Sequence, residues 1–442
     1  MNRKINIVFA CVLAVMLSGV EASFSQINSD SLILVYTKKM QKYLDKEGAW
    51  KDYFVFDKEG ISVYPSLQAK DSGHVELKIS WQEIIHAQKH FYGVPISFST
   101  LYNKTISYRY IPSDIGREWE PFYVPSYTKP LLNQRIALDP GHIAGDIETA
   151  KTEKKWVEMK ANPAKGIKKD IQLIEGELTL STAKLLKKKL EDAGAVVMLT
   201  RDKTNISAFG IDFKKWKDSL FVSSVDSAYR QGNISFEEKN FLLTKANDTE
   251  IFRRFFLQEE MRERARKINE FIPSLTIIIH YNVDETNVNW NKPTKKNFNM
   301  AFVGGSFMND EYEKPESRLE FLRLLLTNEL EKSIEFSSVI AGNFEKYLKV
   351  PLAENLNDAN YLNSSCISAG EKGVYCRNLA LTRMVRGILV YGETLYQDNL
   401  KECQALNEKY FKVYDGSLTS PRCDDVAEAY YWGVLEYLKN KK

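Results

Sequence analysis

The sequence predicts an α/β fold: a mostly parallel, twisted sheet flanked by helices, with helical insertions and a smaller N-terminal α+β region. Three observations lead to this class. From residue 135 onward, short apolar runs alternate with amphipathic helical segments, an order that favours parallel strands joined by right-handed crossovers. Residues 27–130 lack this alternation and are rich in aromatic side chains. At 442 residues, the chain is also too long for one ordinary core.

The individual elements follow from local patterns. A helix is expected over 178–192, because Leu178, Leu186 and Leu190 share one face and Gly194 supplies a stop signal. Ser317 with Glu320 forms a capping box for a helix that continues to residue 336. The other expected elements are strands at 135–138, 195–200, 275–279 and 387–392, and helices at 249–271 and 426–438.

Two segments are longer than the crossovers require. Residues 203–259 lie between a strand and its expected helix, and residues 284–373 precede the last strand. Long insertions near strand ends often form binding walls or lids. Plain surface decoration is the alternative interpretation of both.

Residues 1–22 have the pattern of a secretory signal peptide. A basic start is followed by the apolar run from Ile7 to Val20, with Val20 and Ala22 at the −3 and −1 positions of a cleavage site. A membrane anchor is the alternative, but the run is shorter than the roughly 20 residues that a spanning helix needs. We therefore expect an exported protein, periplasmic or extracellular, with no membrane span after cleavage.

Residues 27–130 form an N-terminal region of unknown role. A helix is expected over 81–87, and His86 with His90 has the spacing that places two imidazoles on one helix face. No Glu follows His86 directly, so a solvated or satisfied pair of histidines is favoured over a set of metal ligands. The three prolines within 121–130 predict a linker.

Charge and cysteine content narrow the function further. A formal charge of +3 gives no reason to expect nucleic acid as a partner. In an oxidising compartment, two disulfides, with three alternative pairings, are favoured over free thiols. The cysteines that remain after signal cleavage are Cys366, Cys376, Cys403 and Cys423.

Four residues at the ends of apolar runs have the chemistry of a hydrolytic metal site. His142 and His280 each follow a strand-like run, where an α/β sheet presents its ligands. Glu175 opens a helical segment, and Glu393 follows the last apolar run. Two imidazoles, one carboxylate and a second, unbound carboxylate are the groups that a hydrolytic zinc centre uses.

The ordered set of motifs around these residues resembles the zinc-dependent N-acetylmuramoyl-L-alanine amidase family, in its amidase 3 catalytic-domain type. Together the matching runs fall between residues 135 and 440. The runs are Ile136-Ala-Leu-Asp-Pro-Gly-His142, Glu175-Gly-Glu-Leu-Thr-Leu-Ser-Thr-Ala183, Gly194-Ala-Val-Val-Met-Leu-Thr-Arg201, Arg264 to Asn269, Ile279-His280-Tyr281-Asn282, and Arg383-Met-Val-Arg-Gly-Ile-Leu-Val-Tyr-Gly-Glu393.

The resemblance implies a catalytic domain over 135–440 that holds Zn²⁺ through His142, Glu175 and His280. Glu393 is implied to be the catalytic carboxylate, and peptidoglycan the substrate. Glu177 remains an alternative to Glu175 as the ligand. The chain departs from the family where Ile143-Ala144 follows the first histidine in place of Gly-Gly.

Two further residues are expected near the same sheet edge. Arg201 and Asn282 are candidates for substrate binding, because an arginine fork suits a peptide carboxylate. For Arg201, pairing with Asp202 or a backbone carbonyl is the alternative. The segment 151–169 carries seven lysines, which predict a solvated loop with interspersed Glu148, Glu153 and Glu158, or contact with anionic cell-wall polymers.

These observations lead to one function hypothesis and two alternatives. The hypothesis is an exported zinc amidase that cuts the bond between N-acetylmuramic acid and L-alanine in cell-wall turnover or cell separation. A regulatory protein or a self-inhibitory insertion would restrain it. The first alternative is a catalytically inactive peptidoglycan-binding scaffold, and the second is another exported zinc amidohydrolase or carboxypeptidase.

Overall fold

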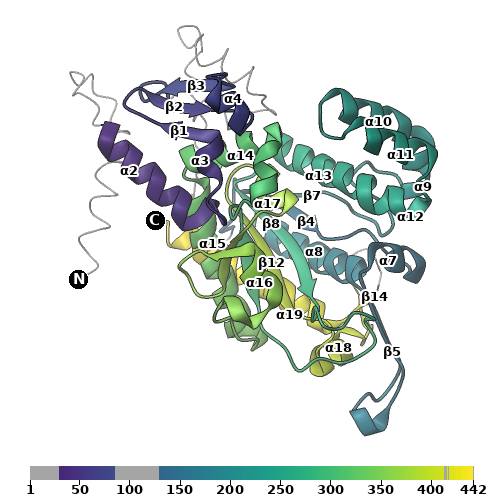
Figure 1. Ribbon diagram of the computed structural model, residues 1–442. Helices are drawn as coiled ribbons and strands as arrows, with labels where there is room; N and C mark the ends of the chain where they lie inside the picture. The colour runs from purple at the N-terminus through teal and green to yellow at the C-terminus, as the bar shows by residue number, and fades with distance from the viewer. Residues whose placement is uncertain (1–28, 85–128, 413–415, 417, 442) are drawn as a thin grey trace.

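The computed structural model describes residues 29–84, 129–412, 416 and 418–441 (Figure 1). Its centre is a seven-stranded sheet with the strand order β10-β11-β9-β12-β8-β4-β7. The strands are β4 (Arg135–Pro140), β7 (Val196–Leu199), β8 (Leu275–Asn282), β9 (Met300–Val303), β10 (Cys366–Ser368), β11 (Val374–Arg377) and β12 (Leu389–Tyr396).

Most neighbouring strands of this sheet are parallel. β4 runs parallel to both β7 and β8, β8 to β12, and β9 to β11. The pairs β9–β12 and β10–β11 are antiparallel. The mixed but mostly parallel sheet confirms the predicted fold class, and it brings the carboxyl ends of β4, β8 and β12 to one edge.

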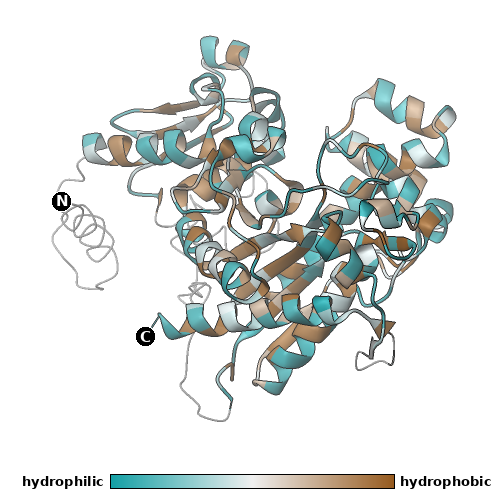
Figure 2. Ribbon diagram, turned by 90° about the horizontal axis from the view of Figure 1, so that it is seen from below, coloured by the Kyte–Doolittle hydropathy of each residue, from teal (hydrophilic) through white to brown (hydrophobic). Residues whose placement is uncertain are grey.

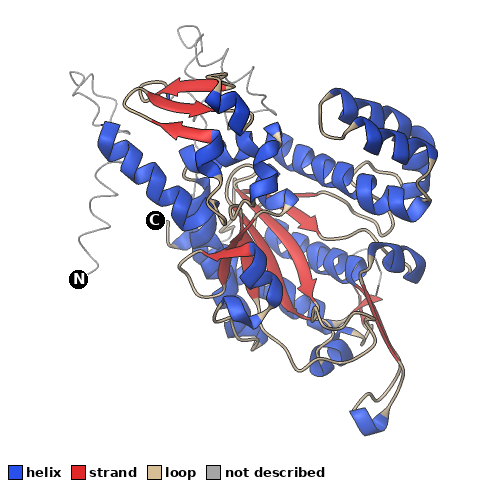
Figure 3. Ribbon diagram, in the orientation of Figure 1, coloured by secondary structure: helices blue, strands red, loops and turns tan. Residues whose placement is uncertain are grey.

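Helices cover both faces of the sheet (Figure 3). One face packs against α8 (Glu175–Asp192), α15 (Glu329–Asn343) and α19 (Pro421–Lys439) in the largest apolar core. The other face packs against α13 (Leu257–Phe271) and α17 (Ala380–Met384). Strands buried on both faces explain the continuous apolar runs in the sequence, and the central strands are hydrophobic in Figure 2.

The N-terminal region packs against elements of the 284–373 segment. Phe54 contacts Phe321 with ring centroids 4.7 Å apart, and Arg318 makes a two-pronged ion pair with Glu76 at 2.8 and 2.9 Å. One apolar cluster contains residues of both the N-terminal region and the 284–373 segment. The elements that meet here are α2 (Ser29–Lys39), η1 (Met40–Leu44), α3 (Trp50–Tyr53), β1 (Phe54–Phe56), β2 (Gly60–Val63), α4 (Leu67–Asp71), β3 (Leu77–Ser80), η6 (Asn309–Glu313) and α14 (Pro315–Leu326).

The 203–259 segment forms a helical unit beside the sheet edge (Figure 1). Its core is aromatic: Trp216 is fully buried and contacts Phe256 at 4.8 Å between ring centroids. Ile143, the residue after His142, packs into this same cluster. The unit comprises α9 (Phe213–Ser219), α10 (Phe221–Arg230), α11 (Phe236–Thr244), α12 (Asp248–Ile251) and η5 (Phe252–Phe256).

The predicted helix from Ser317 to residue 336 is wrong in both its start and its continuity. α14 already begins at Pro315, a residue suited to the first helical turn, and it ends at Leu326. The extended backbone of Thr327 then separates α14 from α15. Glu320 binds Arg323 within the same helix instead of capping its start.

The predicted disulfides are also wrong, because all four cysteines are buried free thiols. In the β10–β11 pair, Cys366 lies opposite Arg377 and Cys376 lies opposite Ile367. Since side chains alternate along a strand, the two thiols point to opposite faces of the sheet. Cys403 and Cys423 pack as small apolar side chains in the main core.

Several predictions concern residues outside the described ranges. These are the signal peptide over 1–22, His86 and His90 with the last three residues of the 81–87 helix, and nearly all of the linker over 121–130. Among the helices that the structure describes, none combines the length and the apolar character needed to cross a bilayer.

The shared core of the N-terminal region makes a testable prediction for stability. Phe54→Ala removes a fully buried ring that contacts Phe321, so we expect the free energy of unfolding to fall by about 3–5 kcal/mol. Leu34→Ala is the control, because Leu34 is 54% exposed and its loss should cost less than about 0.5 kcal/mol. Denaturant unfolding measures both. An unchanged midpoint for Phe54→Ala would show that the N-terminal region adds nothing to the stability of the sheet.

Candidate metal centre

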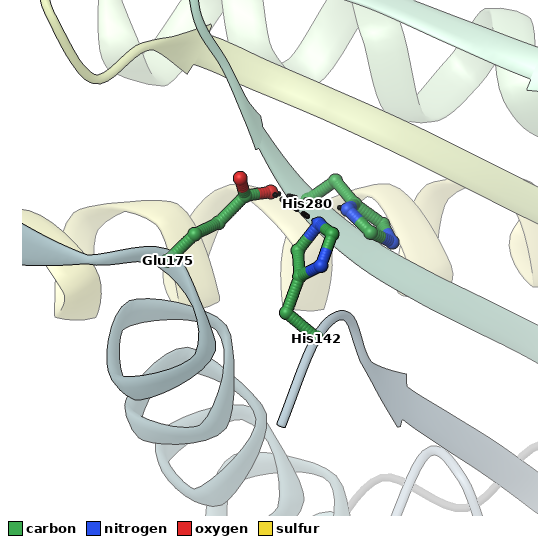
Figure 4. A group of neighbouring side chains, drawn as sticks. All are labelled: His142, Glu175 and His280. Carbon is green, nitrogen blue, oxygen red and sulfur yellow. Dashed lines mark hydrogen bonds and ion pairs between the residues drawn. The ribbon is translucent and has the colours of Figure 1, made fainter. Parts of the chain in front are cut away.

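Three side chains converge at the carboxyl edge of the central sheet (Figure 4). His142 follows β4, His280 lies near the end of the neighbouring strand β8, and Glu175 is the first residue of α8. One nitrogen or oxygen atom from each lies within 4.8 Å of the others, the only such cluster of metal-binding side chains in the described part of the chain. The structure therefore brings together the three residues predicted as ligands.

Glu175 lies at the centre of the cluster. Its Oε1 is 3.1 Å from His280 Nδ1 and 3.4 Å from His142 Nε2. The amide of Tyr281 donates to Oε1 at 3.2 Å, and Gln397 Nε2 donates to Oε2 at 3.1 Å. Because Glu175 is fully buried, these contacts fix its carboxylate in one orientation.

Glu177 does not compete for this position. It lies two residues further along α8, and its carboxylate pairs with Lys409 at 2.8 Å at the partly exposed surface. A shift of two residues along a helix turns the side chain through about 200°. The choice of Glu175 over Glu177 therefore agrees with the geometry.

Close approach of His280 requires a glycine at position 141. A Cβ atom on Gly141 would lie 2.3 Å from the His280 ring, so any larger residue would displace the imidazole. The His280 ring also stacks on Tyr391 of β12, with ring centroids 4.4 Å apart and an angle of 7° between the ring planes. His280 is thus fixed between a backbone turn and an aromatic ring.

His142 has a left-handed backbone conformation, with φ of +58°. This region is costly for a residue with a side chain, so surrounding contacts must stabilise it. Glu153, the last residue of α7 (Ile147–Glu153), accepts hydrogen bonds from the amides of Ile143 and Ala144. Arg264 donates to the His142 carbonyl at 3.1 Å. Two buried charged groups thus hold the turn that carries His142.

Glu153 also contacts the imidazole itself. Its Oε1 lies 3.2 Å from His142 Nδ1, which leaves Nε2 directed at Glu175. The sequence placed Glu153 among the charged residues of a solvated loop, and this was wrong because Glu153 is only 8% exposed. No local pattern marks it, since its role depends on how α7 folds back over the turn.

Arg201 lies beneath the site and binds backbone carbonyls. It is 3% exposed and donates to the carbonyls of Pro140, Gly141 and Gly176 at 2.8–3.2 Å. Burial and the nearby Arg264 lower its pKa to about 9. These contacts match the alternative prediction, that Arg201 pairs with backbone carbonyls. In the described structure they leave no donor of Arg201 directed at solvent for binding a substrate.

Asn282 is likewise committed to protein contacts. It is 8% exposed, its Nδ2 donates to the Tyr361 hydroxyl at 2.8 Å, and its Oδ1 accepts from the amide of Val283. Tyr361 belongs to α16 (Asn360–Ser365), so Asn282 connects the end of β8 to that helix. Its direct contact with substrate stays a prediction.

Glu393 stands beside the cluster on the neighbouring strand. It is opposite His280 in the parallel β8–β12 register, so both side chains lie on the same face of the sheet. Its Oε2 is buried and has no hydrogen-bond partner in the described structure. Burial and the charge of Glu175 raise the pKa of Glu393 to about 7.

The two imidazoles have opposite electrostatic environments. Burial opposes protonation of His142, but the carboxylates of Glu175 and Glu153 raise its pKa to about 9. Burial lowers the pKa of His280 to about 4, and repulsion from His142 adds to this effect. Although Glu175 is buried, His142 and Lys155 hold its pKa well below the usual range. The cluster therefore favours a positive charge beside Glu175.

This donor set fits a divalent metal ion. Within the described ranges, His142 Nε2 is buried without a hydrogen-bond partner and faces Glu175, which is the arrangement expected of a ligand atom. Two imidazole nitrogens and one carboxylate oxygen match the three protein ligands of a catalytic zinc site. The His142–Glu153 contact supplies the carboxylate that commonly orients a zinc-bound histidine.

The sequence matches no known protein-family model and no curated protein. Its fold resembles several solved structures of amidases. The CwlD amidase from Clostridioides difficile, solved in complex with the GerS lipoprotein, is 16% identical over 70% of this chain and 100% of that one, with a TM-score of 0.36. AmiC2, an N-acetylmuramoyl-L-alanine amidase of Nostoc punctiforme, is 12% identical over 69% and 97%, with a TM-score of 0.34.

A third structure, the N-acetylmuramyl-L-alanine amidase Ami1 from Mycobacterium abscessus, is 14% identical over 70% of this chain and 100% of that one, with a TM-score of 0.34. All three TM-scores lie below 0.5. The function of this chain must therefore be argued from its own residues.

The position of Glu153 generates a prediction for metal affinity. Glu153→Gln keeps the shape of the side chain but removes the charge that orients His142, so zinc affinity should fall about 10- to 100-fold. Glu148→Gln is the matched control, because Glu148 is an exposed carboxylate on the same helix. Competition with a chromogenic chelator measures both affinities. Equal affinities of Glu153→Gln and the wild type would contradict the assigned role.

Proposed function

We propose that this chain is an exported zinc hydrolase that cleaves the amide between N-acetylmuramic acid and L-alanine in peptidoglycan. The observation that carries the proposal is the convergence of His142, Glu175 and His280 beside an unpaired carboxylate on the next strand. The order of these residues along the chain, which resembles the amidase 3 type, selects this bond among those that zinc hydrolases cut.

The metal and the protein divide the chemistry between them. Bound at His142, Glu175 and His280, Zn²⁺ would polarise the amide carbonyl and lower the pKa of a coordinated water to about 7. Glu393 takes the proton from the attacking water and delivers it to the leaving amine nitrogen. A carboxylate whose pKa is raised by burial suits this task, because it can both accept and release a proton.

The surrounding residues keep these groups in place. The Tyr391 ring limits rotation of His280, and Gln397 donates a hydrogen bond to Oε2 of Glu175. Glu153 and Arg264 fix the turn that presents His142. A geometry held by so many buried contacts needs little reorganisation when substrate binds, which is how positioning lowers a reaction barrier.

Export and regulation are further parts of the proposal. The signal-peptide pattern over 1–22 supports a periplasmic or extracellular location, where peptidoglycan is accessible. The helical unit over 203–259 packs against Ile143 beside the metal ligand, which supports a restraining role for this insertion. Unchanged turnover of isolated cell wall after deletion of this unit would remove that role.

The proposed reaction predicts a defined product. The zinc-loaded chain should release intact stem peptides from purified peptidoglycan, and a chelator should stop the release. Glu393→Gln should lower the rate about 10²- to 10⁴-fold while zinc stays bound, because only proton transfer is lost. Glu354→Gln, at a side chain 74% exposed, should match the wild type.

Product masses separate this proposal from its alternatives. A carboxypeptidase would release only a terminal amino acid, and an inactive binding protein would release nothing. Either result from the zinc-loaded chain would reject the amidase proposal.

The pKa of Glu393 predicts the acid limb of the pH profile. As a general base it must be ionised, so kcat/KM should fall about tenfold per pH unit once the pH drops below the pKa of Glu393. That pKa is about 7 in the metal-free protein, and the charge of bound Zn²⁺ favours the carboxylate and lowers it. The limb should therefore lie at or below pH 7. An identical limb in the residual activity of Glu393→Gln would show that another group titrates.

A further inference from the structure

Arg377 is an arginine that pairs with no carboxylate among the residues that the structure describes. It is the last residue of β11 and is partly exposed. Its guanidinium packs over the rings of Phe302 and Tyr361, 5.1 and 4.9 Å from their centroids. Among the described residues, its side chain has no hydrogen-bond acceptor and no ion-pair partner. The buried Arg318, by contrast, binds the carboxylate of Glu76 directly.

The strand register places Arg377 on the same face of the sheet as the metal centre. Tyr375 of β11 is opposite Phe302 of β9, and Phe302 is opposite Tyr391 of β12. Since side chains two residues apart share a face, Arg377 lies on the side of Tyr375 and Phe302. This is also the face of Tyr391, and therefore of Glu393.

A continuous row of rings connects Arg377 to the candidate ligand His280. The Phe302 and Tyr391 centroids are 6.0 Å apart, and Tyr391 stacks on His280 at 4.4 Å. The positive charge of Arg377 also lies within electrostatic reach of Glu393. Arg377 therefore lies on the same face of the sheet as the reacting groups and to one side of them.

The position of Tyr361 is itself fixed. Its hydroxyl accepts a hydrogen bond from Asn282 at 2.8 Å and lies 3.5 Å from Met300 Sδ. The ring on which Arg377 rests is thus fastened to the end of β8, next to His280. A guanidinium packed on aromatic rings loses little further freedom when it binds a ligand, and its planar fork matches a carboxylate.

We propose that Arg377 binds a carboxylate of the substrate's peptide, on the leaving-amine side of the amide that is cut. This inference rests on the proposed function and adds a specificity residue to it. The aromatic rings hold the guanidinium in place, and its unpaired N–H groups face the incoming anion. Asn282 contributes by positioning Tyr361.

The test compares two soluble muramoyl tripeptides that differ in one group. The α-carboxylate of the second peptide residue is free in one and amidated in the other. The zinc-loaded wild type should favour the free carboxylate by about 10- to 100-fold in kcat/KM, the range that a charge-assisted pair supports. Arg377→Met should lose this preference by reacting more slowly with the free form only, and Arg377→Lys should keep part of it.

Arg135→Met is the matched control. Arg135 also packs on an aromatic ring, 4.1 Å from the Phe271 centroid, but it opens β4 at the far end of the sheet from the metal centre. This variant should keep the wild-type preference. Thermal melting shows whether the three methionine variants, at Arg377, Arg135 and Lys155, are folded. Two results would overturn the proposal. One is that Arg377→Met lowers kcat/KM equally for both substrates. The other is that the preference for the free carboxylate disappears in Lys155→Met, at the cation near Glu175, and not in Arg377→Met.

Binding measurements separate this inference from the proposed function. Calorimetry measures the affinity for the two free peptides, one with the carboxylate and one with the amide. It needs no turnover, so it reports on Arg377 even if the chain cuts no muramoyl amide. A preference for the free carboxylate that disappears in Arg377→Met supports the subsite. The absence of any such preference in the wild type rejects it, whatever the outcome of the cleavage assay.

Discussion

The metal centre depends on the way buried charges hold the turn after β4. Arg264 is 1% exposed and contacts Asp139, Glu260 and the carbonyls of Pro140 and His142. Desolvation of an isolated guanidinium would cost several kcal/mol, so this arrangement is stable only while its acceptors are present. The turn supplies two of those acceptors, and its left-handed residue is the candidate ligand His142.

A second buried charge acts on the same turn from the other side. Glu153 accepts from the amides of Ile143 and Ala144 and contacts His142 Nδ1. A backbone conformation that would be unfavourable alone is therefore stabilised by two ionic groups from α7 and α13. The acidic and basic residues of this region, which are scattered along the sequence, form one support beneath the three candidate ligands.

The sequence predicted the parts of the site that depend on strand ends. His142, His280 and Glu393 could be found because apolar runs identify strands, and parallel strands present their carboxyl ends at one edge. Glu153 and Gln397 could not be found, because their contacts are made between elements whose packing no local pattern records. The disulfide prediction failed for a similar reason, since pairing depends on which face of β10 and β11 each thiol occupies.

The contact of Ile143 with the aromatic cluster of residues 203–259 connects two parts of the molecule that differ in architecture. The residue next to the candidate ligand His142 is anchored in a helical unit outside the sheet. If a displacement of those helices changes the affinity of the site for an ion, linkage requires that binding of the ion biases the helices to the same extent.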